Sequence, residues 1–143
     1  MGGGRETRRL AVLGWLRLMR VYQKVDRATA EHLRRWGLSV AQFGVLARVG
    51  ASEGMTQQQV ADSLLVTKGN VCQVLDRMEG RGWISRRPEG RTNRLFLTSG
   101  GRRVFDEVLP SQEALISERF SALSKGEQEQ LRALLQMLDR SLG

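Results

Sequence analysis

The sequence predicts a mainly α-helical fold with a small β-hairpin wing (α+β), a winged helix-turn-helix with dimerisation helices at both termini. Three observations predict this class. Two short amphipathic patterns, at 56–65 and 67–81, are separated by a very short turn, as in a helix-turn-helix. A basic segment with strand and turn residues follows at 83–98. Longer segments with an apolar period of 3.6 residues flank this centre at 6–36 and 99–142.

The length and the charge distribution narrow the class of partner. A chain of 143 residues is long enough for one domain with a real core, or for one domain with helical extensions. The net charge is +8, with +6 in residues 1–35 (nine basic, three acidic) and +5 in 36–103 (ten and five). Residues 104–143 carry −3 (four and seven). Such an excess of Lys and Arg predicts a polyanionic partner, although solubility is an alternative explanation.

Several functional classes are excluded by what the sequence lacks. One cysteine cannot form an internal disulfide and suits a reducing compartment, so we expect a cytoplasmic protein. No run of about 18 apolar residues could span a membrane. With one histidine, no HExxH, no GxSxG and no GxxxxGK[ST], we expect no enzyme, no metal site and no cofactor.

The first predicted element is one helix at 6–36, after a glycine-rich start at 1–4 that is expected to be disordered. Gly37 is a natural stop signal. Apolar residues occupy more than one side of the predicted helix, so it needs two packing partners, such as its own domain and another subunit. Residues 1–36 are therefore predicted to form a dimerisation segment.

Two further helices are marked by capping boxes. Ser39 and Gln42 open the second helix, and Thr56 and Gln59 open the third after a polar turn. The inward positions are apolar: Phe43, Leu46 and Val49 in the second helix, then Val60, Ala61, Leu64 and Leu65 in the third.

The fourth helix, at 67–81, is the stretch around which the chain is organised. Thr67 stands at the N-cap position. Val71, Val74, Leu75 and Met78 form an inward stripe. The opposite face carries amide and guanidinium groups that can make bidentate contacts with base edges, on Asn70, Gln73 and Arg77. A solvated surface is the alternative reading of that face.

The segment after this helix is predicted to be a basic hairpin. Trp83–Arg87 and Arg94–Thr98 suit strands, and Pro88 and Gly90 supply turn chemistry between them. Residues 81–103 contain seven arginines and one acidic residue, Glu89. Because such density is repulsive without an anionic partner, the hairpin is predicted to be a wing that binds an anion, with solvated surface as the alternative. Residues 37–98 are thus the predicted DNA-binding lobe.

Residues 99–143 are predicted to be C-terminal dimerisation helices. One helix begins at Thr98 or Ser99, with a kink or break expected at Pro110. Another is capped by Ser124 and Glu127. Its leucine seam is predicted to be a dimer interface, the alternative being that it folds back onto its own subunit: Leu131, Leu134, Leu135, Leu138 and Leu142.

Taken together, four segments resemble the MarR family of bacterial winged-helix transcription regulators: QFGVL (42–46), TQQQVADSLLVTKGNV (56–71), LDRMEGRGWISRR (75–87) and RTNRLFLTSGG (91–101). The resemblance implies a homodimer that binds a palindromic operator, often with a small-molecule site between the dimerisation region and the DNA lobe. It also implies that Arg91 is the wing residue that enters the minor groove. Glu89-Gly90-Arg91 stands where the family usually has Asp-Arg-Arg, so the hairpin is expected to be short, with Glu89 as a carboxylate partner of Arg91.

The resulting hypothesis is a DNA-binding transcriptional regulator, a ligand-responsive repressor that binds double-stranded DNA as a homodimer. Asn70, Gln73 and Arg77 are expected to read bases, and Arg91 to read minor-groove width. The remaining candidates would hold phosphates or sugars through side chains or helix N-termini: Thr56, Gln57, Thr67, Lys68, Arg86 and Arg94. A winged helix that binds an acidic protein partner is the rival hypothesis.

Effector residues are the least specific prediction. By resemblance the effector would be a small aromatic or phenolic compound, and the candidates for lining its cleft are Trp15, Met19, Tyr22, His32 and Phe43. Aromatic residues at helical spacing are more often plain core, and a surface residue without a role is a more common reading of a single histidine such as His32 than a pH sensor. Cys72 lies outside the first helix, where related thiol sensors carry their cysteine, so redox sensing is not expected.

Overall fold

The structure, a computed structural model, describes residues 2–64 and 68–143, so the predicted N-cap Thr67 lies outside the described residues. Among these residues no helix is long and apolar enough to cross a membrane. The elements follow in chain order: α1 (Gly3–Arg34), α2 (Val40–Ala51), β1 (Met55–Thr56), α3 (Gln57–Leu64), α4 (Lys68–Gly80), β2 (Ile84–Glu89), β3 (Thr92–Leu97), α5 (Ser99–Arg119) and α6 (Lys125–Ser141).

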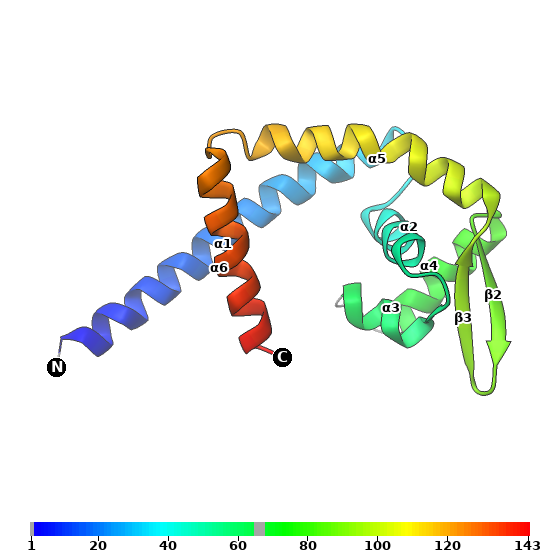
Figure 1. Ribbon diagram of the computed structural model, residues 1–143, viewed down its shortest axis with the longest axis horizontal. Helices are drawn as coiled ribbons and strands as arrows, with labels where there is room; N and C mark the ends of the chain where they lie inside the picture. The colour runs from blue at the N-terminus through cyan, green and yellow to red at the C-terminus, as the bar shows by residue number, and fades with distance from the viewer. Residues whose placement is uncertain (1, 65–67) are drawn as a thin grey trace.

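Figure 1 shows two regions of the molecule. The elements from α2 to β3 form a lobe, with α5 passing over it and the β2–β3 hairpin projecting at its outer side. The C-terminal half of α1 lies beside α5, while its N-terminal half continues past the lobe and is crossed by α6. We call residues 3–22 of α1, together with α6, the arm.

The hydrophobic core lies in and directly above the lobe. Apart from residues of the α1 C-terminal half and of α5, all its members belong to the segment from Leu38 to Leu95. The arm contributes no residue to this core. The fully buried side chains of the core are Leu33, Val45, Leu46, Val49, Val60, Val71, Leu75, Met78, Ile84, Leu95 and Val108.

The helix starts follow the capping signals. The Ser39 and Ser124 capping boxes are both formed, and the Thr98 hydroxyl accepts a hydrogen bond from the Gly101 N–H as the N-cap of α5. Gly37 terminates the α1 region with φ +72, a value that glycine adopts without strain. The prediction of a disordered start was wrong. Gly3 and Gly4 are helical, because a long helix gains one hydrogen bond for each residue added. Of the kink or break expected at Pro110, the break is absent, since α5 is one continuous helix from Ser99 to Arg119.

The sheet contains one strand that sequence analysis missed. Its order is β1-β3-β2, with Met55 opposite Leu95 and Thr56 opposite Arg94. The hairpin strands are longer than predicted, because Pro88 pairs with Asn93 and only Gly90 and Arg91 remain in the turn. Pro88 is tolerated there because β2 is an edge strand, where a missing N–H costs no ladder bond.

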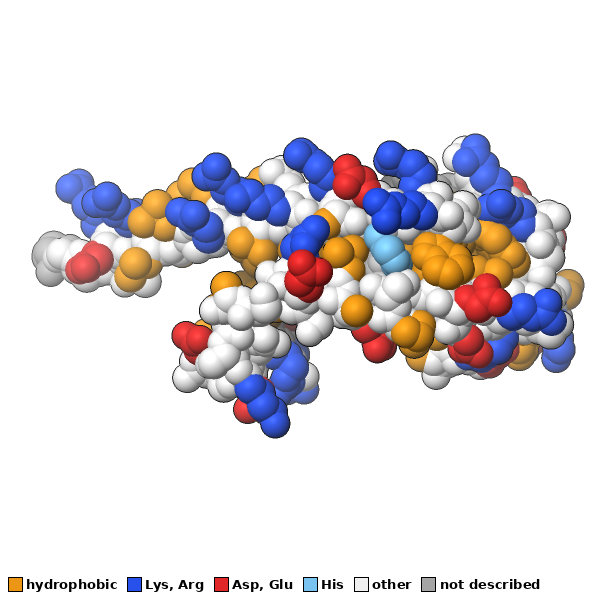
Figure 2. Space-filling view, turned by 90° about the horizontal axis from the view of Figure 1, so that it is seen from above, with side chains coloured by type: hydrophobic (Ala, Val, Ile, Leu, Met, Phe, Trp, Pro, Cys, Tyr) orange, Lys and Arg blue, Asp and Glu red, His pale blue; other side chains and the backbone are white. Residues whose placement is uncertain are grey.

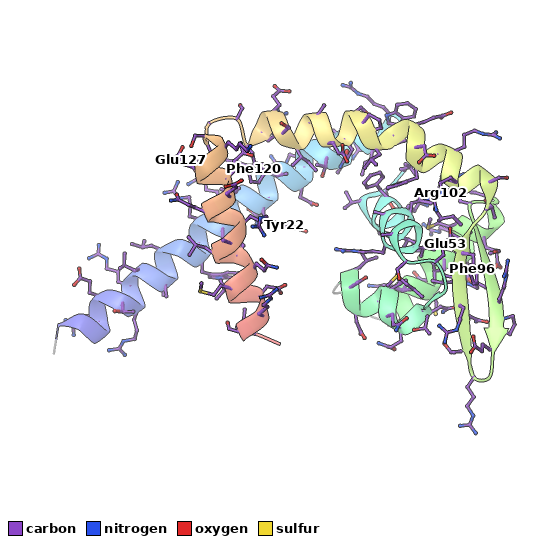
Figure 3. The ribbon with its side chains drawn as sticks, viewed as in Figure 1. Tyr22, Glu53, Phe96, Arg102, Phe120 and Glu127 are labelled. Atoms are coloured by element: carbon purple, nitrogen blue, oxygen red, sulfur yellow. The ribbon has the colours of Figure 1, made fainter. Side chains whose placement is uncertain are left out.

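The start of α5 is locked to the base of the wing. The Thr98 N–H donates to the Trp83 carbonyl oxygen at 3.1 Å. Gly101 is buried so closely against the same residue that a Cβ added to it would lie 2.0 Å from the Trp83 oxygen. Glu53 and Arg102 point toward one another across this junction (Figure 3), with Nη2 and Oε1 3.0 Å apart. The lobe and α5 are therefore held as one packed unit.

Candidate nucleic-acid interface

The α4 helix separates an apolar face from a polar one. Val71, Leu75 and Met78 are at most 1% exposed and anchor the helix on the core. Asn70, Gln73 and Arg77 are exposed on the surface of the lobe, where their amide and guanidinium groups can reach outward. Lys68 is the first residue of α4.

At the start of α3, the predicted capping box is present. The Gln59 N–H donates to the Thr56 hydroxyl at 3.1 Å, and the Thr56 N–H donates to the Gln59 side-chain oxygen at 2.9 Å. The hydroxyl of Thr56 therefore already accepts a hydrogen bond from a backbone N–H of the first turn of α3. Its remaining lone pair and the backbone N–H groups of the first turn are what this helix start can offer to a phosphate.

Gln57 takes part in a polar cluster inside the lobe. Its side-chain nitrogen lies 3.4 Å from the Cys72 Sγ, and its oxygen accepts a hydrogen bond from Asn93 Nδ2 at 3.2 Å. The cluster joins α3, α4 and β3. The structure thus places Gln57 between elements, with its amide engaged on both ends.

Arg86 fastens the wing to α4. Its side chain is only 18% exposed, and its Nη1 lies 2.8 Å from the Asp76 Oδ1. Its Nη2 donates to the Cys72 carbonyl oxygen at 3.4 Å. A guanidinium held by two groups of α4 stabilises the angle between that helix and the hairpin. Sequence analysis placed Arg86 among the candidate DNA contacts, because spacing along the chain does not show that Arg86 contacts Asp76 and the Cys72 carbonyl oxygen.

Glu89 pairs with Arg94, so the predicted pairing of Glu89 with Arg91 is wrong. The Glu89 carboxylate accepts a short hydrogen bond from the Arg94 Nε, and the Arg94 Nη1 donates to the Gly54 carbonyl oxygen at 2.8 Å. Strand register explains this choice. Glu89 faces Thr92, and residues two apart on a strand share a face, so Arg94 is the diagonal neighbour of Glu89.

Arg91 differs from the other wing arginines. It is exposed in the two-residue turn, and within residues 2–64 and 68–143 no hydrogen bond or ion pair engages it. Gly90 beside it has φ +61, which allows the tight turn. Arg87, by contrast, stacks over the Phe96 ring at 4.2 Å. The hairpin therefore presents one unengaged cation at its tip.

Basic side chains extend beyond the lobe. Seen from above, Lys and Arg side chains follow the length of α1 and the top of the lobe, with the single histidine among them (Figure 2). The positive charge is therefore spread over both regions.

The structure does not bring the five effector candidates together. Trp15, Met19 and Tyr22 are 59%, 37% and 66% exposed on the arm. His32 is half-buried between α1 and α5, where its Nδ1 lies 2.8 Å from the oxygen of buried Gln112. Phe43 packs against Phe105, with ring centroids 5.7 Å apart.

Two of these candidates, Trp15 and Phe43, line two different grooves. Trp15 lines an apolar groove of about 670 Å³ between α1 and α6. Phe43 lines a different groove of about 470 Å³ beside α2 and α3. Within the part of the chain that the structure describes, no group of three or more His, Cys, Asp or Glu side chains could hold a metal ion.

The fold and this surface define a winged helix-turn-helix protein. Comparisons with known proteins identify the family. The family model described as "MarR family" matches residues 36–94. An HTH-type transcriptional regulator of Bacillus cereus is 34% identical over 122 residues, covering 85% of this chain and 83% of the relative. The regulator PecS of Dickeya dadantii is 32% identical over 133 residues, covering 87% and 79%.

Solved structures agree with this assignment. A cysteine-to-serine mutant of E. coli MarR, crystallised with operator DNA, superimposes with a TM-score of 0.79 at 29% identity, covering 91% of this chain and 95% of that one. A MarR-family regulator of Rhodococcus sp. RHA1 gives a TM-score of 0.82 at 27% identity, covering 90% and 92%. The chain belongs to the MarR family. It is a DNA-binding transcriptional regulator and not an enzyme.

Proposed function

We propose that this regulator is a cytoplasmic, ligand-responsive repressor that acts as a homodimer on a palindromic operator, with a small aromatic or phenolic effector. The observation that carries the proposal is the combination of an outward polar face on α4 with an arm whose apolar side chains lie in solvent. The first supplies base recognition, and the second supplies the contact that would pair two lobes.

The arm supports the dimer. On α6, Leu134, Leu138 and Leu142 are 62%, 50% and 78% exposed. They continue into the apolar groove against α1, whose walls include Leu18, Phe120 and Leu131. Tyr22 and Phe120 extend from α1 and from the end of α5 near this crossing (Figure 3). A continuous exposed apolar surface of this kind is typical of an obligate interface.

A two-fold axis through the two arms would present two α4 helices to one duplex. Major-groove readers of this type bind half-sites about 10 base pairs apart, centre to centre. The E. coli relative crystallised with operator DNA supports this arrangement. In the proposal, residues 1–36 and 99–143 dimerise, and residues 37–98 form the DNA-binding lobe.

Each DNA-facing residue then has a proposed role. Asn70, Gln73 and Arg77 read base edges in the major groove, and Arg91 enters the minor groove. Thr56, Lys68 and Arg94 bind the phosphate backbone beside them. Gln57 and Arg86 act by positioning α3, α4 and the wing, since their contacts join these elements to one another.

The test uses the purified full chain and a duplex containing the region upstream of its own gene. Sedimentation measures the oligomeric state, and fluorescence anisotropy measures DNA affinity across a salt series. We expect a dimer, preference for the upstream duplex over a random one, and a steep negative slope of log affinity against log salt concentration. A monomer, or no binding of any duplex at low salt, would contradict the proposal.

Variants assign the roles. Arg77→Ala should cost about 1–3 kcal/mol on the operator and relax the preference at one base pair. Arg91→Ala should weaken specific and random duplexes alike and reduce the salt slope by about 0.9 per lost phosphate contact. An unchanged slope in Arg91→Ala would show that the wing tip does not touch the DNA backbone.

A further inference from the structure

We propose that the outer side of α1 is a second DNA-binding surface, which holds another segment of double-stranded DNA while α4 reads the operator. This inference goes beyond the proposed operator binding, which uses only the lobe. The surface consists of five arginines of α1, which we call the basic row: Arg5, Arg9, Arg20, Arg27 and Arg34.

The spacing of these arginines places them on one side of α1. At about 100° per residue, all five lie within a sector of roughly 60°. At a rise of about 1.5 Å per residue, the row is about 44 Å long, and Arg20, Arg27 and Arg34 follow one another at intervals of about 10 Å. One turn of a DNA duplex is about 34 Å long. Because α1 is one continuous helix, the row can lie along more than one turn of duplex.

The basic row faces solvent along its whole length, since all five of its side chains are exposed. Its centre lies roughly 110–170° around α1 from three residues that face the rest of the chain. Leu18 lines the groove against α6, and Thr29 and Leu33 are buried. The side of α1 that packs on the molecule is therefore not the side that carries the row.

The basic row and the reading face of α4 lie on different sides of the molecule. In the view from above, Lys and Arg side chains follow the length of α1 (Figure 2). In Figure 1, α3, α4 and the tip of the β2–β3 hairpin lie below α5. A duplex bound to α4 and the wing would thus leave the row open to a second duplex segment.

The guanidinium groups of the basic row are available to an external anion. Within residues 2–64 and 68–143, no ion pair or side-chain hydrogen bond engages any of the five. Two acidic residues of the same helix, Glu6 and Glu31, lie roughly 60° to one side of the row. Five cations therefore adjoin two carboxylates, and this excess of positive charge along a line attracts a polyanion.

Double-stranded DNA fits the basic row better than an acidic protein does. A guanidinium binds a phosphate through two parallel hydrogen bonds. A duplex presents phosphates at short, regular intervals over any length, whereas an acidic protein would need a straight line of carboxylates about 44 Å long. Because phosphate contacts carry no sequence information, the second segment can have any sequence. One dimer would then bridge an operator and another stretch of duplex.

The experiment is a two-duplex capture assay with the full chain. The duplex from the region upstream of its own gene is immobilised and saturated with protein, and a labelled random duplex is added at low salt after washing. We expect the labelled duplex to be captured, with an affinity that falls steeply as the salt concentration rises. Binding to the immobilised duplex is read first and tests the proposed function separately. If that duplex is not bound, an immobilised random duplex takes its place, so the row is tested either way.

A triple variant, Arg9→Gln/Arg20→Gln/Arg27→Gln, removes the middle of the basic row. It should lower the affinity for the labelled duplex about tenfold and flatten the salt slope of capture by about 0.9 for each lost phosphate contact. Sedimentation should show the same oligomeric state as the native protein, because the row lies away from the apolar groove against α6.

The matched control is Arg8→Gln/Arg35→Gln/Arg140→Gln, which removes three exposed arginines outside the row and changes the net charge equally. It should capture the labelled duplex like the native protein. The two triple variants should bind the immobilised duplex with equal affinity.

Four results would overturn the proposal. The first is no capture by the native protein at low salt, and the second is capture that the two triple variants reduce equally or not at all. The third is a changed oligomeric state in the row variant, which would assign the row to the subunit interface. The fourth is binding of labelled polyglutamate that depends on the row while duplex capture does not, which would assign the row to an acidic protein.

Discussion

The lobe and the arm differ in how far their apolar side chains are exposed: the lobe buries them and the arm leaves many of them in solvent. In the lobe, Val45, Leu75 and Leu95 are at most 1% exposed, and polar side-chain contacts join β3 to α3 and β2 to α4. In the arm, Trp15 and Leu138 are 59% and 50% exposed, although the helices that carry them are regular. The lobe buries its apolar side chains together with Leu33 of α1 and Val108 of α5, whereas the arm leaves many of its own exposed. The difference supports the proposed division of roles, in which the lobe binds DNA and the arm joins two copies.

The most sensitive test of the comparison is a charge in the exposed seam. Leu138→Asp should abolish the dimer, because each interface would bury two unpaired carboxylates at a cost of roughly 3 kcal/mol or more. The lobe should keep its fold, since Leu138 contributes nothing to its core. Sedimentation measures the dimer, and circular dichroism measures the fold.

Ala133→Asp is the matched control, because residue 133 lies about 140° from residue 138 around α6. It should leave the dimer intact. If both variants remain dimeric, the seam is not the interface.

The second test breaks the packed junction between the lobe and α5. Gly101→Ala should lower the free energy of unfolding by about 3 kcal/mol, because the new methyl would meet the Trp83 backbone oxygen and backbone cannot move aside. Denaturant unfolding at fixed protein concentration measures this.

In the arm, Gly126→Ala adds the same methyl to a glycine that has nothing within 4 Å of the new atom. Its effect should stay within about 1 kcal/mol. Equal effects of the two substitutions would contradict the difference in packing.

A third test separates positioning from DNA contact within the lobe. Arg86→Gln should lower the free energy of unfolding by about 1 kcal/mol, since its partner Asp76 is 66% exposed and solvent weakens the pair. Its salt slope for DNA binding should match that of the native protein. A flatter slope in Arg86→Gln would mean that Arg86 binds a phosphate after all.

The smallest expected effect concerns the start of α6. Hydrogen bonds from the Ser124 backbone N–H and hydroxyl lower the pKa of Glu127 from its ordinary value of 4.5. The folded pKa is thus below the unfolded one, so this stabilisation is present above the unfolded pKa and is lost as the pH falls through the folded pKa. Amide hydrogen exchange at the first turn of α6 should accelerate in that acidic range.

Glu127→Gln should keep the capping box, because a glutamine side chain can accept the same backbone hydrogen bond. The substitution should remove the pH dependence of amide hydrogen exchange at the first turn of α6, because glutamine does not titrate. Acceleration of equal size in this variant would assign the acid sensitivity to another group.

Local signals predicted most of the fold. The capping boxes at Ser39, Thr56 and Ser124 formed because both partners lie three residues apart. The inward stripe of α4 was also predicted correctly, since Val71, Leu75 and Met78 are buried. The α4 readers and Arg91 were placed on exposed positions, and their contacts with DNA stay a prediction.

The errors share a physical cause. The strand β1 exists only because β3, about 40 residues later, pairs with it. Glu89 pairs with Arg94 and not with Arg91, because strand register chose its partner. The partners of Gln57 and Arg86 were likewise set by packing, and contacts of these two residues with DNA stay a prediction.

The sequence by itself determined the order and length of the helices, the winged helix-turn-helix class, and the polar outward face of α4, because these depend on residues within a few turns of one another. Only the tertiary structure decided which polar groups are engaged inside the lobe and that the apolar side chains of the arm are exposed. Those properties depend on side chains meeting across long chain separations, where neither spacing nor residue type specifies the partner.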